Sequence, residues 1–97
     1  VNFPAMPATL DADLIAKMAE QGEFGPALAA GPISLDIAVS PRAAKVKGFS
    51  HPVAGRADIL CVPDIESGNV LYKSLSTFSG ADMAGIVTGS EAPIVVP

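Results

Sequence analysis

The first region that could do chemistry is a polar turn, Val62-Pro63-Asp64-Ile65-Glu66-Ser67-Gly68-Asn69, which lies between an apolar run and a predicted helix. In open α/β sheets ligands bind beyond the carboxyl ends of the strands, and a helix N-terminus there offers free N–H groups to an anion. Gly68 permits close backbone approach, and Asn69 adds a donor and an acceptor. Lys73 follows Asn69 by four residues on the same helix face, where its ammonium group could reach a phosphate. The candidate substrate-binding residues are therefore Asp64, Ser67, Gly68, Asn69 and Lys73.

Ordinary helix capping is the alternative interpretation of this turn. Asp64 or Ser67 would be the N-cap, Glu66 would lie near the positive end of the helix dipole, and Gly68 would be a steric accommodation. The turn fits no standard phosphate-binding fingerprint such as GxxxxGK[ST], and Lys73 fits a solvated lysine equally well. Spacing alone does not decide between helix capping and anion binding at this turn.

The other reactive side chains form no recognisable catalytic or metal site. His51 is the only imidazole, and Ser50 beside it is not thereby a catalytic partner, because nucleophile and base must meet in space with a third, orienting group. Cys61, flanked by apolar neighbours, is expected to be a buried apolar residue rather than a nucleophile. One His, one Cys and scattered carboxylates match no metal-ligand pattern, so we expect no metal ion. We also expect no cofactor.

Basic residues concentrate in one region, at Arg42, Lys45, Lys47 and Arg56, with His51 between them. One interpretation is a solvated helix face and loop. The other is a local attraction for an anionic small molecule.

Composition and charge exclude several classes of protein. In 97 residues, 49% are hydrophobic and 16% charged, which excludes a disordered chain and is well below the roughly 25% charged fraction of average soluble domains. The net charge of -4, without a basic stripe, argues against nucleic acid as a partner. The longest uncharged stretch, residues 24–35, is short and interrupted by Gly and Pro, so no membrane partner is expected. No secretory signal is visible and the single Cys has no internal partner, which suits the cytoplasm.

The first half of the chain predicts two helices and a strand. A helix over about residues 10–21 has apolar residues at amphipathic spacing, with Thr9 and Asp11 as candidate caps. Residues 27–35, small and apolar, predict a buried strand that ends in a turn. Ser40-Pro41 then predicts the start of a short helix that Gly48 closes.

The second half predicts an α/β fold. The apolar run over residues 57–62 is typical of a buried strand, and a helix over about residues 67–78 follows, with Val70, Leu71, Leu75 and Phe78 toward the core. Residues 83–87 and 93–96 predict two further strands. Together they indicate right-handed βαβ units on a parallel sheet. The last strand has no helix after it to cover it, so we expect a piece of a longer protein, or a chain completed by another chain.

Four segments together resemble the phosphate acetyltransferase and phosphate butyryltransferase family: residues 31–40, 43–48, 50–55 and 57–73. They cover nearly the whole chain in consistent order. The most specific motif is Pro-Asp-hydrophobic-x-x-Gly-Asn-x-x-x-Lys, from Pro63 to Lys73, and the Pro-Val-Ala-Gly segment that begins at Pro52 strengthens the match.

The resemblance implies a two-domain α/β enzyme with the isocitrate and isopropylmalate dehydrogenase-like fold, a homo-oligomer with its active site in the cleft between domains. The implied reaction converts acyl-CoA and phosphate to acyl phosphate and CoA by direct attack, so coenzyme A is a substrate. This reaction needs a base to form the CoA thiolate and donors that hold phosphate and the developing oxyanion. Acetyl and butyryl substrates are not distinguished.

The resemblance also places the family's catalytic Ser-Arg pair, with an Asp shortly beyond it, directly after the strand that Ile94-Val95-Val96 resembles. We therefore expect residues 1–97 to be a single fragment of a larger acyltransferase, without its N-terminal region and its C-terminal catalytic motif, and inactive alone. The turn at Asp64 and Lys73 would be a wall of the phosphate or acyl phosphate pocket.

Two other functions stay open. One is a noncatalytic interaction or assembly module whose apolar surface is covered by a partner chain. The other is a related dehydrogenase-like enzyme, which the Pro-Val-Ala-Gly and Gly-Asn segments fit less well.

Overall fold

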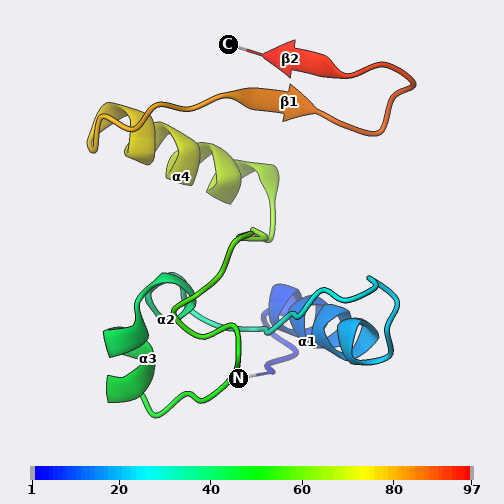
Figure 1. The fold of residues 1–97 in the computed structure, drawn as a ribbon, viewed down its shortest axis with the longest axis vertical. Helices are drawn as coiled ribbons and strands as arrows, with labels where there is room; N and C mark the ends of the chain where they lie inside the picture. The colour runs from blue at the N-terminus through cyan, green and yellow to red at the C-terminus, as the bar shows by residue number, and fades with distance from the viewer. Residues whose placement is uncertain (1, 97) are drawn as a thin grey trace. The chain divides into compact units, whose positions relative to one another are not determined.

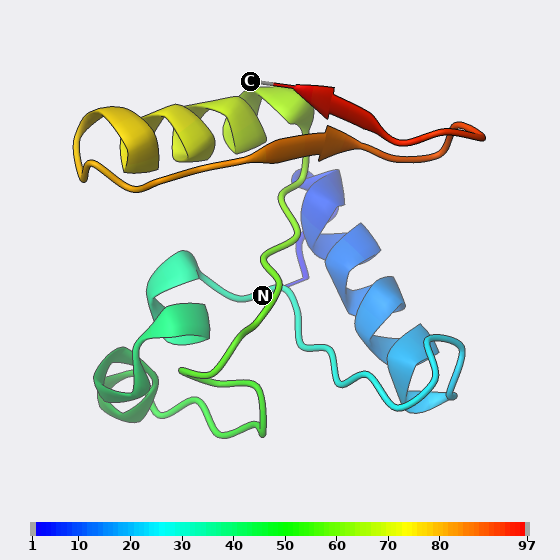
Figure 2. The same cartoon turned by 45° about the horizontal axis from the view of Figure 1, so that its top comes forward.

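A computed structural model describes residues 2–96. The chain divides into two units, Val1–Cys61 and Val62–Pro97. The first unit contains three helices, and the second contains one helix and two strands (Figures 1 and 2). The elements in chain order are α1 (Pro7–Glu20), α2 (Leu35–Val39), α3 (Pro41–Val46), α4 (Ile65–Thr77), β1 (Gly85–Val87) and β2 (Ile94–Val96). The chain is thus a mixed α and β structure, and each unit is described by itself.

Helix α1 confirms the first predicted helix but begins earlier, at Pro7, whose fixed φ suits the first helical position. The N-cap is Met6, which makes no side-chain cap hydrogen bond. Thr9 and Asp11 were wrong as caps. The Thr9 hydroxyl instead accepts a hydrogen bond from the Phe3 N–H at 2.8 Å and donates to the Met6 carbonyl at 2.8 Å, tying the preceding turn to the helix.

The predicted strand over residues 27–35 is wrong. This segment is coil, and its last residue belongs to α2, a helix that the pattern did not predict. A strand is stable only when its backbone groups pair with a neighbouring strand, and the sheet of the described chain contains β1 and β2 alone. The coil packs against α1 instead, as the close approach of Gly31 to α1 shows: a Cβ at Gly31 would lie 3.1 Å from the Ala12 Cβ.

Helices α2 and α3 contact each other and contain the buried hydrophobic residues Ala38 and Ala44. The start of α3 is as predicted: the Ser40 hydroxyl accepts a hydrogen bond from the Ala43 N–H at 3.1 Å. The turn after α3 also fits the prediction, because Gly48 has a φ of +69°.

The chain beyond α3 returns to α2 at Gly55. Its N–H donates to the Ile37 carbonyl at 2.7 Å, and the Ala57 N–H donates to the Ala38 carbonyl at 3.1 Å. Gly55 has a φ of +71°, and a Cβ built there would lie 2.5 Å from the Pro41 nitrogen. Only glycine satisfies both the left-handed backbone and this close approach.

Helix α4 confirms the helix predicted in the second unit, but the strand predicted over residues 57–62, which precede α4 in the chain, and the parallel sheet are wrong. Residues 57–62 are not a strand, and Ile59 is 82% exposed. Strands β1 and β2 pair antiparallel, with Ile86 opposite Val95, and Figure 1 shows their arrows in opposite directions. Residues 88–93 join them, whereas a parallel pair needs a crossover of about a dozen residues or more. The βαβ unit therefore does not form here.

The apolar stripe of α4 is not buried in this unit. Val70 is 68% and Phe78 85% exposed, and no residue of α4 counts as buried. The prediction that this stripe faces a core is wrong for the described chain, because β1 and β2 comprise three residues each and offer little surface to cover it.

The close approach at Gly55 yields a stability prediction. Gly55→Ala should lower the free energy of unfolding of the complete gene product by about 3 kcal/mol, since it adds overpacking against Pro41 to the cost of a left-handed alanine. Gly48→Ala is the matched control, because Gly48 has a similar φ of +69° and no atom within 4 Å of its added Cβ. The control should lose only about 1–2 kcal/mol. Urea unfolding measures both, and equal losses would contradict the steric argument.

Candidate functional site

The polar turn before α4 is built by a helix cap at Asp64. This residue is in extended conformation, and its carboxylate accepts a hydrogen bond from the Ser67 N–H at 2.7 Å. Asp64 is therefore the N-cap of α4, and Ser67 lies in the first turn. The capping interpretation is confirmed for Asp64, whereas Ser67 is the residue that is capped.

The negative charge of the Asp64 carboxylate is stabilised by hydrogen bonds from Ser67. Hydrogen bonds from the Ser67 hydroxyl and the Ser67 N–H lower its pKa. An ionised Asp64 occupies a first-turn N–H group that an anion would otherwise use, and it adds negative charge at the helix N-terminus. Anion binding by the N–H groups of this turn is therefore disfavoured.

Gly68 lies one residue further into α4 and is partly buried. A Cβ there would lie 3.1 Å from a methyl group of Val62, which is tighter than ordinary contact. The missing side chain thus lets the segment before the cap pack against the first turn of α4. This is the steric accommodation that the sequence offered as an alternative to a ligand contact.

Two exposed polar side chains further along α4 are those of Asn69 and Lys73, which lie one helical turn apart. The Lys73 ammonium lies 5.7 Å from the centroid of the Tyr72 ring, within range of a cation–π contact. Asn69 supplies an amide donor and Lys73 a charge. This pair can bind an anion, but it holds no base.

His51 and Cys61 lie in the first unit and form no catalytic pair there. The Nδ1 atom of His51 accepts a hydrogen bond from the Val53 N–H at 3.0 Å, and its ring stacks with Phe49 at a centroid distance of 6.3 Å. His51 therefore shapes its own loop. Cys61 is exposed, so the prediction of a buried thiol is wrong, because the strand that would have buried it does not form.

Part of the basic region is already paired. Lys47 makes an ion pair with Asp36 at 2.8 Å and contacts the Ser34 hydroxyl at 3.5 Å. The Lys47 ammonium and the Ser34 hydroxyl lower the pKa of Asp36 to about 2. Sequence spacing did not link Asp36 to Lys47, because the link depends on the contact between α2 and α3.

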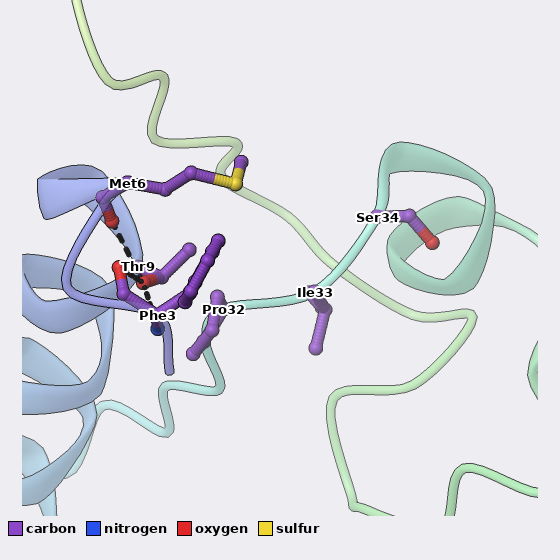
Figure 3. Close-up of a pocket in the computed structure, with 6 residues that line it drawn as sticks. All are labelled: Phe3, Met6, Thr9, Pro32, Ile33 and Ser34. Carbon is purple, nitrogen blue, oxygen red and sulfur yellow. Dashed lines mark hydrogen bonds between the residues drawn. The ribbon is translucent and has the colours of Figure 1, made fainter. Parts of the chain in front are cut away.

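A hollow lies in the first unit, where the sequence predicted no site (Figure 3). It has a volume of about 340 Å³ and mostly apolar walls. The Thr9 hydroxyl in its wall is already hydrogen-bonded to backbone atoms of Phe3 and Met6, as Figure 3 shows. The hollow therefore lacks converging polar groups that would orient a reactant. Its lining residues are Phe3, Met6, Thr9, Pro32, Ile33 and Ser34.

Metal-binding and membrane-spanning features were sought over residues 2–96. No group of three or more His, Cys, Asp or Glu side chains within that range is placed to hold a metal ion. None of the helices in the same range has the length and apolar character needed to cross a bilayer.

A family model described as "Phosphate acetyl/butaryl transferase" matches residues 2–96. The chain belongs to this family. It is 51% identical to a phosphate acetyltransferase of Rickettsia prowazekii, over 95% of this chain and 26% of the relative. It is 45% identical to a phosphate butyryltransferase of Clostridium acetobutylicum, over 96% of this chain and 31% of the relative.

A solved structure shows the same fold. The crystal structure of a branched-chain phosphotransacylase from Enterococcus faecalis V583 superposes with a TM-score of 0.80 at 38% identity. The match covers 98% of this chain and 34% of the other. The chain thus spans about a third or less of the family members it matches. The resemblance inferred from the Pro63 to Lys73 motif is confirmed at the level of the family.

The Asp36–Lys47 pair of this family member yields a pH prediction. Because the folded pKa of Asp36 lies near 2, below the ordinary 3.8, ionised Asp36 stabilises the fold above the ordinary pKa. This contribution is lost as the pH falls from about 4 to about 2. Asp36→Asn should destabilise the complete protein at pH 7 and flatten this part of its stability profile. Urea unfolding as a function of pH measures the effect, with Asp58→Asn as the control. A variant that keeps the full acid dependence would contradict the assignment.

Proposed function

We propose that the complete protein transfers an acetyl or butyryl group between coenzyme A and inorganic phosphate. The observation that carries the proposal is the family match over residues 2–96, together with relatives that bear both acyltransferase names. Coenzyme A is then a substrate, and no cofactor is needed because neither electrons nor a covalent carrier take part. The acyl carbon leaves sulfur and bonds to a phosphate oxygen.

We also propose the setting of this reaction. The complete protein is a larger α/β acyltransferase with the two-domain isocitrate and isopropylmalate dehydrogenase-like fold, and residues 1–97 are one fragment of it. It is a cytoplasmic homo-oligomer with acyl-CoA and phosphate as partners, without nucleic acid or membrane. The match to about a third of a phosphotransacylase supports the size, and the net charge of -4 supports the exclusion of nucleic acid.

Within this fragment, the proposed substrate-binding residues are those of the α4 turn, with different tasks. Lys73 provides a positive charge for a phosphate or acyl phosphate, and Asn69 donates a hydrogen bond to one of its oxygens. Asp64 and Ser67 hold the helix start, and Gly68 lets Val62 approach it. Because Asp64 is ionised, the anion would bind along the Asn69 and Lys73 face rather than on the first-turn N–H groups. The base is supplied from outside these residues.

Turnover of the complete gene product tests the function. Acetyl-CoA or butyryl-CoA should be consumed only when phosphate is present, with release of one CoA thiol for each acyl phosphate formed. The 97-residue chain alone should be inactive, because Asn69 and Lys73 can bind but cannot activate a nucleophile. Absence of phosphate-dependent turnover in the complete protein would overturn the proposal.

The substrate-binding role of the turn has its own prediction. Lys73→Gln in the complete protein should raise the KM for phosphate about tenfold, since it removes a charge-assisted contact. Asn69→Ala should raise it less, because its contact is neutral. Lys17→Gln is the control, since Lys17 is also a helical lysine but is paired with Asp13 at 2.8 Å. An unchanged KM for phosphate in Lys73→Gln would make this lysine a solvated residue.

A second candidate function, an assembly module, is favoured by the exposed apolar surface. Large hydrophobic side chains such as Val46, Ile59 and Phe78 are each 79% or more exposed, while the buried hydrophobic residues among residues 2–96 are two alanines. Such surface favours a covering partner. Light scattering on the 97-residue chain tests the assembly module against the acyltransferase. A folded chain that stays monomeric would count against the assembly module. A dehydrogenase-like enzyme would instead reduce a nicotinamide cofactor, which absorbance detects.

A further inference from the structure

Two arginines of the basic region begin from neighbouring points of the backbone. Arg42 directly follows Pro41, and Arg56 directly follows Gly55, although the two arginines are far apart in sequence. The Gly55 backbone lies against Pro41, where an added Cβ would be 2.5 Å from its nitrogen. The fold of the first unit therefore brings the residue before Arg42 into contact with the residue before Arg56.

Both backbones are held firmly. The Gly55 N–H donates to the Ile37 carbonyl at 2.7 Å, and the Arg56 N–H donates to the Val53 carbonyl at 2.9 Å. On the other side, Ser40 caps α3 at the Ala43 N–H. Anchored backbones reduce the entropy lost when the two side chains close on a ligand.

Neither arginine has an internal counterion within residues 2–96. The ion pairs there join Lys17 to Asp13 and Lys47 to Asp36, so Asp36 is already engaged. Arg42 and Arg56 are both exposed. A bound anion offsets the repulsion between two positive charges that extend from adjoining parts of the backbone. A guanidinium presents a planar fork of donors, which matches phosphate oxygens.

We propose that Arg42 and Arg56 bind the phosphate groups of the nucleotide part of coenzyme A. The inference rests on the proposed function, under which the anionic substrates are CoA and inorganic phosphate. Reacting phosphate requires a site that excludes water, whereas the nucleotide phosphates take no part in the reaction and can bind at an exposed patch. The first-turn N–H groups of α3 are not part of this patch, because Ser40 already occupies the Ala43 N–H.

The test is steady-state kinetics of the complete gene product carrying Arg42→Gln and Arg56→Gln together. The KM for acyl-CoA should rise about tenfold, while kcat and the KM for inorganic phosphate stay unchanged. Acyl-pantetheine lacks every phosphate, so its KM should be the same in the variant and the wild type. Lys17→Gln is the control for loss of a surface cation, and the melting temperature of each variant checks its fold.

Three results would overturn the proposal. The KM for acyl-CoA could stay within about twofold of wild type. It could rise equally for acyl-pantetheine, which would make the arginines structural. The KM for inorganic phosphate could rise instead, which would assign the patch to that anion. If the wild-type protein shows no acyl transfer, the proposed function fails separately, and calorimetric titration with CoA and with pantetheine still decides whether the arginines select for phosphate.

Discussion

The contact of Gly55 with Pro41 is the constraint on which much of the first unit depends. It requires a residue without a side chain and with a φ of +71°, and it brings the chain after the His51 loop back onto the start of α3. The hydrogen bonds from Gly55 and Ala57 to α2 carbonyls extend the same contact. Ala38 and Ala44, the buried hydrophobic residues of the described chain, lie on the two helices that this contact joins.

Because the buried hydrophobic residues described in the first unit are two alanines, polar contacts contribute a large share of its stability. Burying an apolar side chain stabilises a fold in proportion to its area, and alanine offers little area. Caps such as that of Ser40 and the Asp36–Lys47 pair therefore matter more here than they would around a large core. The low charged fraction of 16% has the same cause as the exposed apolar side chains: much of this surface is chemically suited to contact with protein.

Local signals predicted the structure where the physics is local. Ser40 before a proline fixes a helix start through one side chain and one N–H group, and Asp64 does the same for α4. The strands predicted over residues 27–35 and 57–62 did not form, because the stability of a strand depends on partners distant in sequence, whereas those predicted over residues 83–87 and 93–96 are present as β1 and β2. The run at residues 57–62 has the composition of a buried strand, yet it lacks a neighbour here and leaves Cys61 exposed. The antiparallel pairing of β1 and β2 could have been predicted from the sequence, since the connection between them is too short for the crossover that a parallel pair needs.

Sequence spacing predicted where the candidate residues lie on α4, but not which backbone N–H group Asp64 occupies. Spacing placed Asn69 and Lys73 on one face of α4, and the helix confirms this. The sequence left open whether Asp64 caps this helix or binds a ligand, and only the second alternative leaves the helix N-terminus free for an anion. Once its carboxylate accepts the Ser67 N–H, the cap and a phosphate compete for the same donor, and the covalently attached carboxylate is always present. The proposed phosphate binding therefore relies on side chains further along the helix, where the positive charge of Lys73 can offset the negative charge of Asp64.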